Sequence, residues 1–136
     1  MPALAADPIT QSDAYQGFLA YQDGYIAAME GDNVRAVEKI RAALPSDPQS
    51  GRYRYTLAGA YMNMGKYVEA IQTLEDALAT DMNEVYRAYS YYRLGKIYEG
   101  MGNREKMFAA FRQVLELAIG DPEIEDYARR IVGEQK

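Results

Sequence analysis

The segment from Gly59 to Tyr67, which reads GAYMNMGKY, comes closer than other stretches to a motif of known chemistry. A phosphate-binding loop has four residues between two glycines, then lysine, then a serine or threonine whose hydroxyl binds magnesium. Here five residues separate Gly59 from Gly65, and Tyr67 follows Lys66 where the hydroxyl ligand is required. The segment also lies inside a helical repeat, so we reject nucleotide binding.

The chain contains no histidine and no cysteine among its 136 residues. This excludes disulfides, thiol nucleophiles and Cys-ligated metals, and it removes the commonest general base and the commonest zinc ligand. Serines are few, none lies in a nucleophile-elbow motif, and paired carboxylates fall only on helix surfaces. The sequence therefore predicts a protein that is not an enzyme and has no metal site and no cofactor.

The charge balance is acidic, with 20 Asp and Glu against 15 Lys and Arg and a formal net charge of -5. A nucleic-acid partner is not expected, because phosphate binding needs a basic surface. Insertion into a membrane is not expected either, because no apolar run approaches the ~20 residues that span a bilayer. Acids gather at Glu123, Glu125 and Asp126, where a favourable interaction with a helix dipole is a stronger interpretation than a cation site.

These residues are positioned by elements that repeat along the chain. At a shift of 34 residues the matching pairs are Gly24 with Ala58, Gly31 with Gly65, Ala36 with Ala70, Ile40 with Leu74, Ala43 with Ala77 and Leu44 with Leu78. At a further shift of 37 they are Leu57 with Leu94, Ala58 with Gly95, Tyr61 with Tyr98, Gly65 with Gly102, Leu74 with Phe111 and Leu78 with Leu115. We expect the three extra residues, which precede Ala88, to lengthen a helix by about a turn.

Each of the three units, at about 17–50, 51–84 and 88–121, reads as two helices. In the second unit Leu57, Tyr61 and Met64 fall at helical spacing, Gly65-Lys66 forms a turn, and a second apolar stripe follows. Prolines at positions 45, 48 and 122 end second helices. The pattern predicts an all-α protein built from stacked helix pairs.

This pattern resembles the tetratricopeptide repeat. The residues that carry the resemblance are Leu57, Ala58 and Tyr61 with Leu94, Gly95 and Tyr98, the turn glycines Gly65 and Gly102, and Ala70, Leu74, Ala77 and Leu78 with Met107, Phe111, Val114 and Leu115. Unit three departs from the family pattern at Arg104 and Met107, and unit one at Asp23 and Ala27. The resemblance implies a right-handed α-solenoid over roughly residues 17–121.

Gly95 lies within a helical stretch, where glycine costs about 1 kcal/mol relative to alanine. Gly24 and Ala58 share its phase. We interpret this phase as the place where the first helix of each unit packs closely on its own second helix. Replacement of Gly95 by leucine is therefore expected to overpack the contact and to cost ~1–3 kcal/mol or more.

The two ends of the chain differ in pattern from the repeats. An apolar stripe predicts a capping helix and C-terminal tail over 122–136, formed by Ile124, Tyr127, Ala128, Ile131 and Val132. Residues 1–12 are expected to be a poorly ordered tail, although 3–7 resemble the end of a secretory signal peptide. The sequence favours a cytoplasmic location, with an exported or periplasmic one as the alternative.

The resemblance also implies a binding groove, because first helices line the concave face of such a solenoid and ligands of the family contact that face. The groove positions we predict in this way are Tyr21, Tyr25, Arg52, Tyr55, Met62, Asn63, Tyr89, Tyr92, Arg93 and Lys96. Tyr21, Tyr55 and Tyr92 share one phase and should form a ladder. Such tyrosines either pack between neighbouring helices or supply rigid anchors to a peptide.

The basic residues predicted for the groove are Arg52, Arg93 and Lys96, in a protein that is otherwise acidic. They favour a ligand with an acidic residue or a free carboxylate beside apolar anchors. Some co-chaperones of the family grip the C-terminal carboxylate of heat-shock proteins with Lys, Asn and Arg residues. Only Arg93 matches that set here, so that particular clamp is not expected.

The leading functional hypothesis is a protein-interaction module, an adaptor, assembly factor or chaperone-like protein that holds a partner's peptide or helix in the groove. A second hypothesis is a self-associating structural scaffold, a homo-oligomer, or a fragment of a longer solenoid. An accessory domain of an enzyme is a third.

Overall fold

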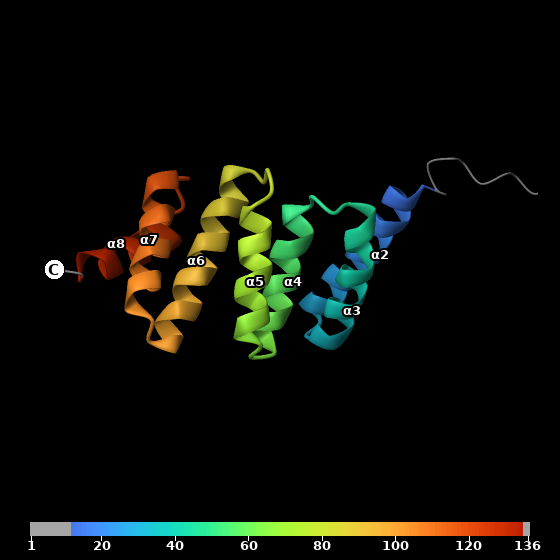
Figure 1. Cartoon of the computed structure of the whole chain (residues 1–136), viewed down its shortest axis with the longest axis horizontal. Helices are drawn as coiled ribbons and strands as arrows, with labels where there is room; N and C mark the ends of the chain where they lie inside the picture. Colours follow the sequence, from blue (N-terminus) through green and yellow to red (C-terminus); the bar gives the residue numbers. More distant parts are fainter. Residues whose placement is uncertain (1–11, 135–136) are drawn as a thin grey trace, which may run out of the picture.

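The computed structural model describes residues 12–134, and the regular structure within this range is helical throughout. With labels as in Figure 1, the helices are α2 (Asp13–Met29), α3 (Asn33–Ala43), α4 (Gly51–Asn63), α5 (Tyr67–Leu78), α6 (Glu84–Met101), α7 (Arg104–Leu117) and α8 (Pro122–Gly133), with a 3-10 turn at Leu44–Ser46. The prediction of an all-α protein is confirmed.

The helices associate as three pairs, α2 with α3, α4 with α5, and α6 with α7. Figure 1 shows the pairs following one another in chain order along the long axis, with α8 at the C-terminal end. Each pair packs mainly on its neighbours, which is the organisation of a helical solenoid. The core is correspondingly continuous, and its largest fully buried side chains include Ile40, Leu74 and Phe111, one from the second helix of each pair.

Two helices begin earlier than the repeat bounds alone would place them. α6 begins at Glu84 and has 18 residues, so the extra residues before Ala88 lengthen the helix as predicted. α2 begins at Asp13, and Ser12 caps it by accepting a hydrogen bond of 3.1 Å from the Tyr15 backbone N–H. Ser12 therefore belongs to the folded domain, and the rest of the predicted tail, residues 1–11, lies outside the described residues.

The turns within the second and third pairs depend on glycine, as the sequence predicts. Gly65 and Gly102 have φ angles of 72° and 75°, in the left-handed region that side chains with a Cβ seldom adopt. These conformations reverse the chain within a few residues. The second helix of each pair can therefore fold back along the first.

Gly95 lies at the closest approach of α6 to α7. A Cβ atom added there would come within 2.7 Å of two ring atoms of Phe111, whose side chain is fully buried. Gly24 has the same role in the first pair, where an added Cβ would lie 2.7 Å from Cγ1 of Ile40. The predicted contact between the two helices of a pair is thus present in the structure.

Helix α8 covers the C-terminal end of the last pair. Ile124, Ala128 and Ile131 are buried against α6 and α7, while Tyr127 and Val132 are partly buried beside them. The predicted apolar stripe is therefore the face that packs. Among the described residues, no helix is both long and apolar enough to cross a membrane.

At the junction between α6 and the start of α8, the Tyr89 hydroxyl donates a hydrogen bond to the Asp121 carboxylate. Asp121 also caps α8 by accepting a hydrogen bond of 2.9 Å from the backbone N–H of Glu123. The hydrogen bond from Tyr89 lowers the pKa of Asp121, and it raises the pKa of Tyr89 to about 12. The junction is therefore complete when the carboxyl is ionised and the phenol is neutral.

We expect Tyr89→Phe to lower the melting temperature at neutral pH, because it removes this bond. A carboxyl with a lowered folded pKa stabilises above its unfolded value, about 3.9, and the effect is lost as the pH falls through the folded value. The difference in Tm from the natural protein should therefore shrink as the pH drops below about 4. Tyr91→Phe on the same helix is the control. A Tyr89→Phe effect that is as large in strong acid as at neutral pH would contradict this role of Asp121.

Candidate functional site

Four of the predicted groove residues surround one hollow of about 290 Å³ between the first helices of the three pairs. Tyr25 comes from α2, Tyr55 and Asn63 from α4, and Arg93 from α6. The other residues that line the hollow are Ala28, Met29, Thr56, Gly59 and Ala60. The walls are thus aromatic or apolar for the most part, and Arg93 is the cationic residue among them.

The Arg93 guanidinium is held in a fixed orientation. Its Cζ atom lies 3.6 Å from the centre of the Tyr55 ring, and Nη1 donates a hydrogen bond of 2.5 Å to the Tyr55 carbonyl oxygen. Gly59 leaves room for it, because a Cβ added there would lie 3.2 Å from Nη1. Helices α4 and α6 therefore position the charged group jointly.

The charge on Arg93 is desolvated and lacks an anionic partner in the described part of the chain. Burial lowers the pKa of Arg93, although the side chain stays protonated at any physiological pH. The ion pairs found within residues 12–134 are formed by Arg35 and Lys39 with Asp23, Lys96 with Glu99, and Arg129 with Asp126. A desolvated guanidinium with donors left over is suited to bind a carboxylate.

The tyrosine ladder proves to pack largely between units. The Tyr21 ring is only 3% exposed and stacks on Tyr53 of the next unit at 4.3 Å, and its hydroxyl lies 2.9 Å from Thr56 Oγ1. Tyr92 packs edge-on against Tyr127 of α8 at 5.8 Å. Tyr21 is therefore a core residue and not part of an open groove surface. This agrees with the packing interpretation, one of the two that the sequence leaves open.

Tyr55 combines the two roles. It packs edge-on against Tyr86 of the following unit, with ring centres 5.2 Å apart, and burial raises its pKa. It also lines the hollow and carries the Arg93 guanidinium on its face. The same side chain thus joins two units and forms a wall of the candidate site.

The remaining predicted residues lie away from this hollow. Lys96 forms an ion pair of 3.5 Å with Glu99 and donates a hydrogen bond of 3.0 Å to the Tyr127 hydroxyl. It also lines a separate hollow with Met62, beside the turn that ends α6. Arg52 is exposed and lies 5.5 Å from the centre of the Tyr21 ring. The predicted set of ten is therefore not a single site.

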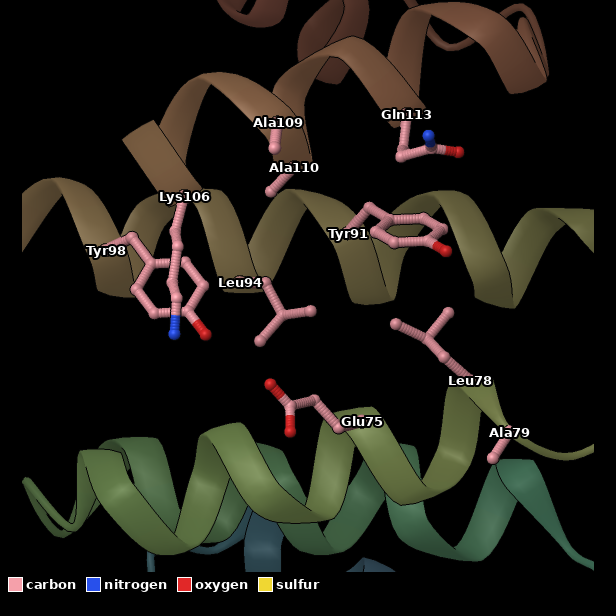
Figure 2. A pocket seen from close by; sticks show the side chains of 10 residues that line it. All are labelled: Glu75, Leu78, Ala79, Tyr91, Leu94, Tyr98, Lys106, Ala109, Ala110 and Gln113. Carbon is pink, nitrogen blue, oxygen red and sulfur yellow. The ribbon is translucent and has the colours of Figure 1, made fainter. Parts of the chain in front are cut away.

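A larger hollow, of about 530 Å³, lies on the opposite face, between the second helices α5 and α7. Figure 2 shows Tyr91, Leu94 and Tyr98 of α6 between these two helices, with Glu75 of α5 on one side and Lys106 of α7 on the other. We call it the outer cleft. The cleft was not predicted, because the family resemblance implies ligand contacts on first helices; the adjacent alanines 109 and 110 were the signal of open space in the sequence.

The outer cleft has no excess of positive or negative charge. Its two charged residues, Glu75 and Lys106, are opposite in sign. Burial, and after it the nearby Glu75, raise the pKa of the Tyr98 phenol in this cleft. In addition, no group of three or more acidic side chains anywhere in residues 12–134 is arranged to hold a metal ion. Of these two hollows, the one around Arg93 is therefore the one whose charged lining has a single sign.

Two models of the tetratricopeptide repeat match the sequence, one over residues 27–90 and the other over residues 88–118. Together they span most of the chain and agree with the helix pairs seen in the structure. The chain belongs to the tetratricopeptide repeat family.

Solved structures of the same fold cover most of this chain at low identity. The Arabidopsis OM64 TPR domain is 18% identical with a TM-score of 0.76, and the match covers 88% of this chain and 96% of that one. The first TPR of Spaghetti (RPAP3), bound to the HSP90 peptide SRMEEVD, is 21% identical with a TM-score of 0.76, covering 90% and 97%.

A third similar structure is the Yersinia enterocolitica type III secretion chaperone SycD in complex with a peptide of the translocator YopD. It is 16% identical with a TM-score of 0.69, and the match covers 85% of this chain and 86% of that one. No curated protein sequence matches the chain. At these identities the likeness establishes the fold.

Proposed function

We propose that this chain is a non-catalytic protein-interaction module that binds a peptide or helix of a partner protein in the hollow between α2, α4 and α6. The observation that carries the proposal is the Arg93 guanidinium, which is desolvated on the Tyr55 ring without an anionic partner in the described chain. The ligand presents a carboxylate to this group, either from an acidic side chain or from a chain terminus.

The walls of the hollow determine what lies beside the carboxylate. Tyr25 and Met29 are 45% and 73% exposed, so apolar anchors of a ligand can cover them. A volume of about 290 Å³ is at the lower limit of small-molecule sites and holds one or two side chains. A peptide that crosses the three first helices therefore fits better than a compact metabolite.

Two of the similar structures support a peptide ligand, because one contains an HSP90 peptide and another a YopD peptide. They show that a solenoid of this size can hold a peptide, and this chain shares their fold. We therefore infer an adaptor, assembly factor or chaperone-like role for it.

A display library of random peptides, selected on the intact protein, tests this proposal. We expect the enriched peptides to share an Asp, Glu or free C-terminal carboxylate beside apolar residues. Their binding should be lost in the groove variant Tyr25→Ala with Arg93→Met and kept in the cleft variant Ala109→Arg, once circular dichroism shows that both are folded. Enriched peptides without a carboxylate, or binding lost only in the cleft variant, would refute the proposal.

A further inference from the structure

The N-terminal end of the solenoid exposes an apolar surface that the C-terminal end does not. In the described part of the chain, six of the ten large apolar side chains that are exposed lie between residues 18 and 34: Phe18, Leu19, Tyr25, Ile26, Met29 and Val34. At the other end, α8 covers the last pair. Helix α2 contacts α3, α4 and the short turn after α3, so its outer side is uncovered by any described residue.

The outer side of α2 has the spacing of a helix-packing seam. Tyr15, Leu19, Gln22, Ile26 and Met29 follow one another at intervals of four, three, four and three residues. This is the repeat by which two helices pack along each other as in a coiled coil. A helix with an apolar stripe on its outer side as well as its inner side is normally buried on both.

The seam carries no charged residue. The acidic residue of α2 closest to it, Asp23, is tied to α3 by a hydrogen bond of 2.8 Å from Arg35 and by Lys39 at 3.6 Å. These contacts, first of all the hydrogen bond from Arg35, lower the pKa of Asp23. Two seams can therefore meet without opposing like charges along the contact.

The seam is also close to symmetric about its only amide residue, since Tyr15 and Met29 both lie seven residues from Gln22 while Leu19 lies three and Ile26 four. Gln22 is its midpoint, with two apolar residues before it and two after it. If two copies pack antiparallel, Leu19 faces Ile26 of the other copy, Tyr15 faces Met29, and the two Gln22 amides face each other and can exchange hydrogen bonds. An interface between identical subunits related by a two-fold axis requires self-complementarity of this kind.

We propose that the outer side of α2 packs antiparallel on the same surface of a second copy of this chain, with the two-fold axis at Gln22. The antiparallel direction also places the helix dipoles favourably. A buried amide pair at the centre fixes the register at some cost in stability. The contact is separate from the hollow around Arg93, apart from Met29, which lies at the edge of both.

Cross-linking through introduced cysteines tests the direction and the register, because the natural chain has none. Gln22→Cys in the full chain is expected to form a disulfide-linked dimer under mild oxidation. Leu19→Cys should not link to itself but should link to Ile26→Cys when the two variants are mixed. Gln22→Cys that links no faster than Val68→Cys, on the exposed side of α5, would overturn the proposal, and self-linking of Leu19→Cys would overturn the antiparallel direction.

Sedimentation equilibrium of the full chain over a concentration series tests whether the outer side of α2 forms the dimer contact. The natural protein is expected to dimerise, and Leu19→Glu should weaken dimerisation at least tenfold, about 1.4 kcal/mol. Val68→Glu should leave it unchanged. A protein that stays monomeric at every concentration overturns the proposal. This holds whether another segment of the chain or a different partner covers α2. A dimer that Leu19→Glu leaves intact overturns it as well.

Discussion

Gly95→Ala is expected to lower the free energy of unfolding by about 1–3 kcal/mol, although alanine is normally the better helix residue by about 1 kcal/mol. The reason is steric, since the new Cβ would lie 2.7 Å from ring atoms of Phe111, a side chain that is fully buried. A leucine at this position should cost more. Chemical denaturation followed by circular dichroism measures the change.

Gly100→Ala, on the same helix, is the matched control. A Cβ added there would meet no atom within 4 Å, and the residue is already helical. We expect this substitution to raise the free energy of unfolding by about 0.5–1 kcal/mol, so the two variants should have opposite signs. Equal effects would show that helix propensity, not close packing, decides what residue is tolerated at position 95.

The second unit suggests how the Gly95 variant can be rescued. At the equivalent positions it has Ala58 and Leu74, so a larger residue on the first helix accompanies a smaller one on the second. Phe111→Leu should therefore be destabilising in the natural protein and much less so in the Gly95→Ala background. A double-mutant cycle with no coupling between the two sites would contradict a direct contact.

Arg93→Met is expected to abolish most of the binding of an acidic peptide while leaving the fold as stable as before. Methionine keeps an apolar stem against Tyr55, and it removes a desolvated charge that has no counter-charge in the described chain. We expect the free energy of unfolding to change by less than about 1 kcal/mol. Affinity should fall by at least about 2 kcal/mol, roughly thirtyfold in Kd.

Arg93→Lys distinguishes geometry from charge. Lysine keeps the positive charge but not the planar fork that stacks on an aromatic ring and binds a carboxylate through two donors. Its affinity should lie between those of the natural protein and Arg93→Met. If Arg93→Met lost stability in proportion to binding, the side chain would be a structural link between α4 and α6 and not a ligand receptor.

The fold could be predicted because it depends on local periodicity. The spacing of apolar residues, the glycines at turns and the small residues at positions 24, 58 and 95 all follow from how two helices of a pair meet. The length of α6 was predictable for the same reason, since extra residues within a helical pattern extend the helix. The position of each residue within its repeat unit was thus sufficient to predict the helices and how they pair.

The site was predicted only in part, because a repeat pattern fixes the phase of a side chain and not its surroundings. Tyr21 and Tyr55 share one phase, yet Tyr21 is buried under Tyr53 whereas Tyr55 remains beside a hollow. What differs is the side chain that the next unit places against each ring, and that residue lies about 30 positions or more further along the chain. The sequence alone could not say which tyrosine would be covered.

The difference between Arg93 and Lys96 was partly visible in the sequence. Glu99 follows Lys96 by three residues, a spacing at which side chains on a helix pair, so the neutralisation of Lys96 could have been predicted. The stacking of Arg93 on Tyr55 could not, because it depends on the approach of α4 to α6 next to Gly59. Long-range geometry therefore distinguishes Arg93, the residue we propose as the carboxylate receptor, from Lys96.

The most direct test of the central claim is to map a selected acidic peptide on the protein by NMR, from the backbone amide shifts during a titration. We predict that the shifts concentrate on α2, α4 and α6 around Tyr25, Tyr55 and Arg93, and that they disappear with Arg93→Met. Shifts that concentrate instead on α5 and α7 around the outer cleft, and that persist in Arg93→Met, would contradict the account.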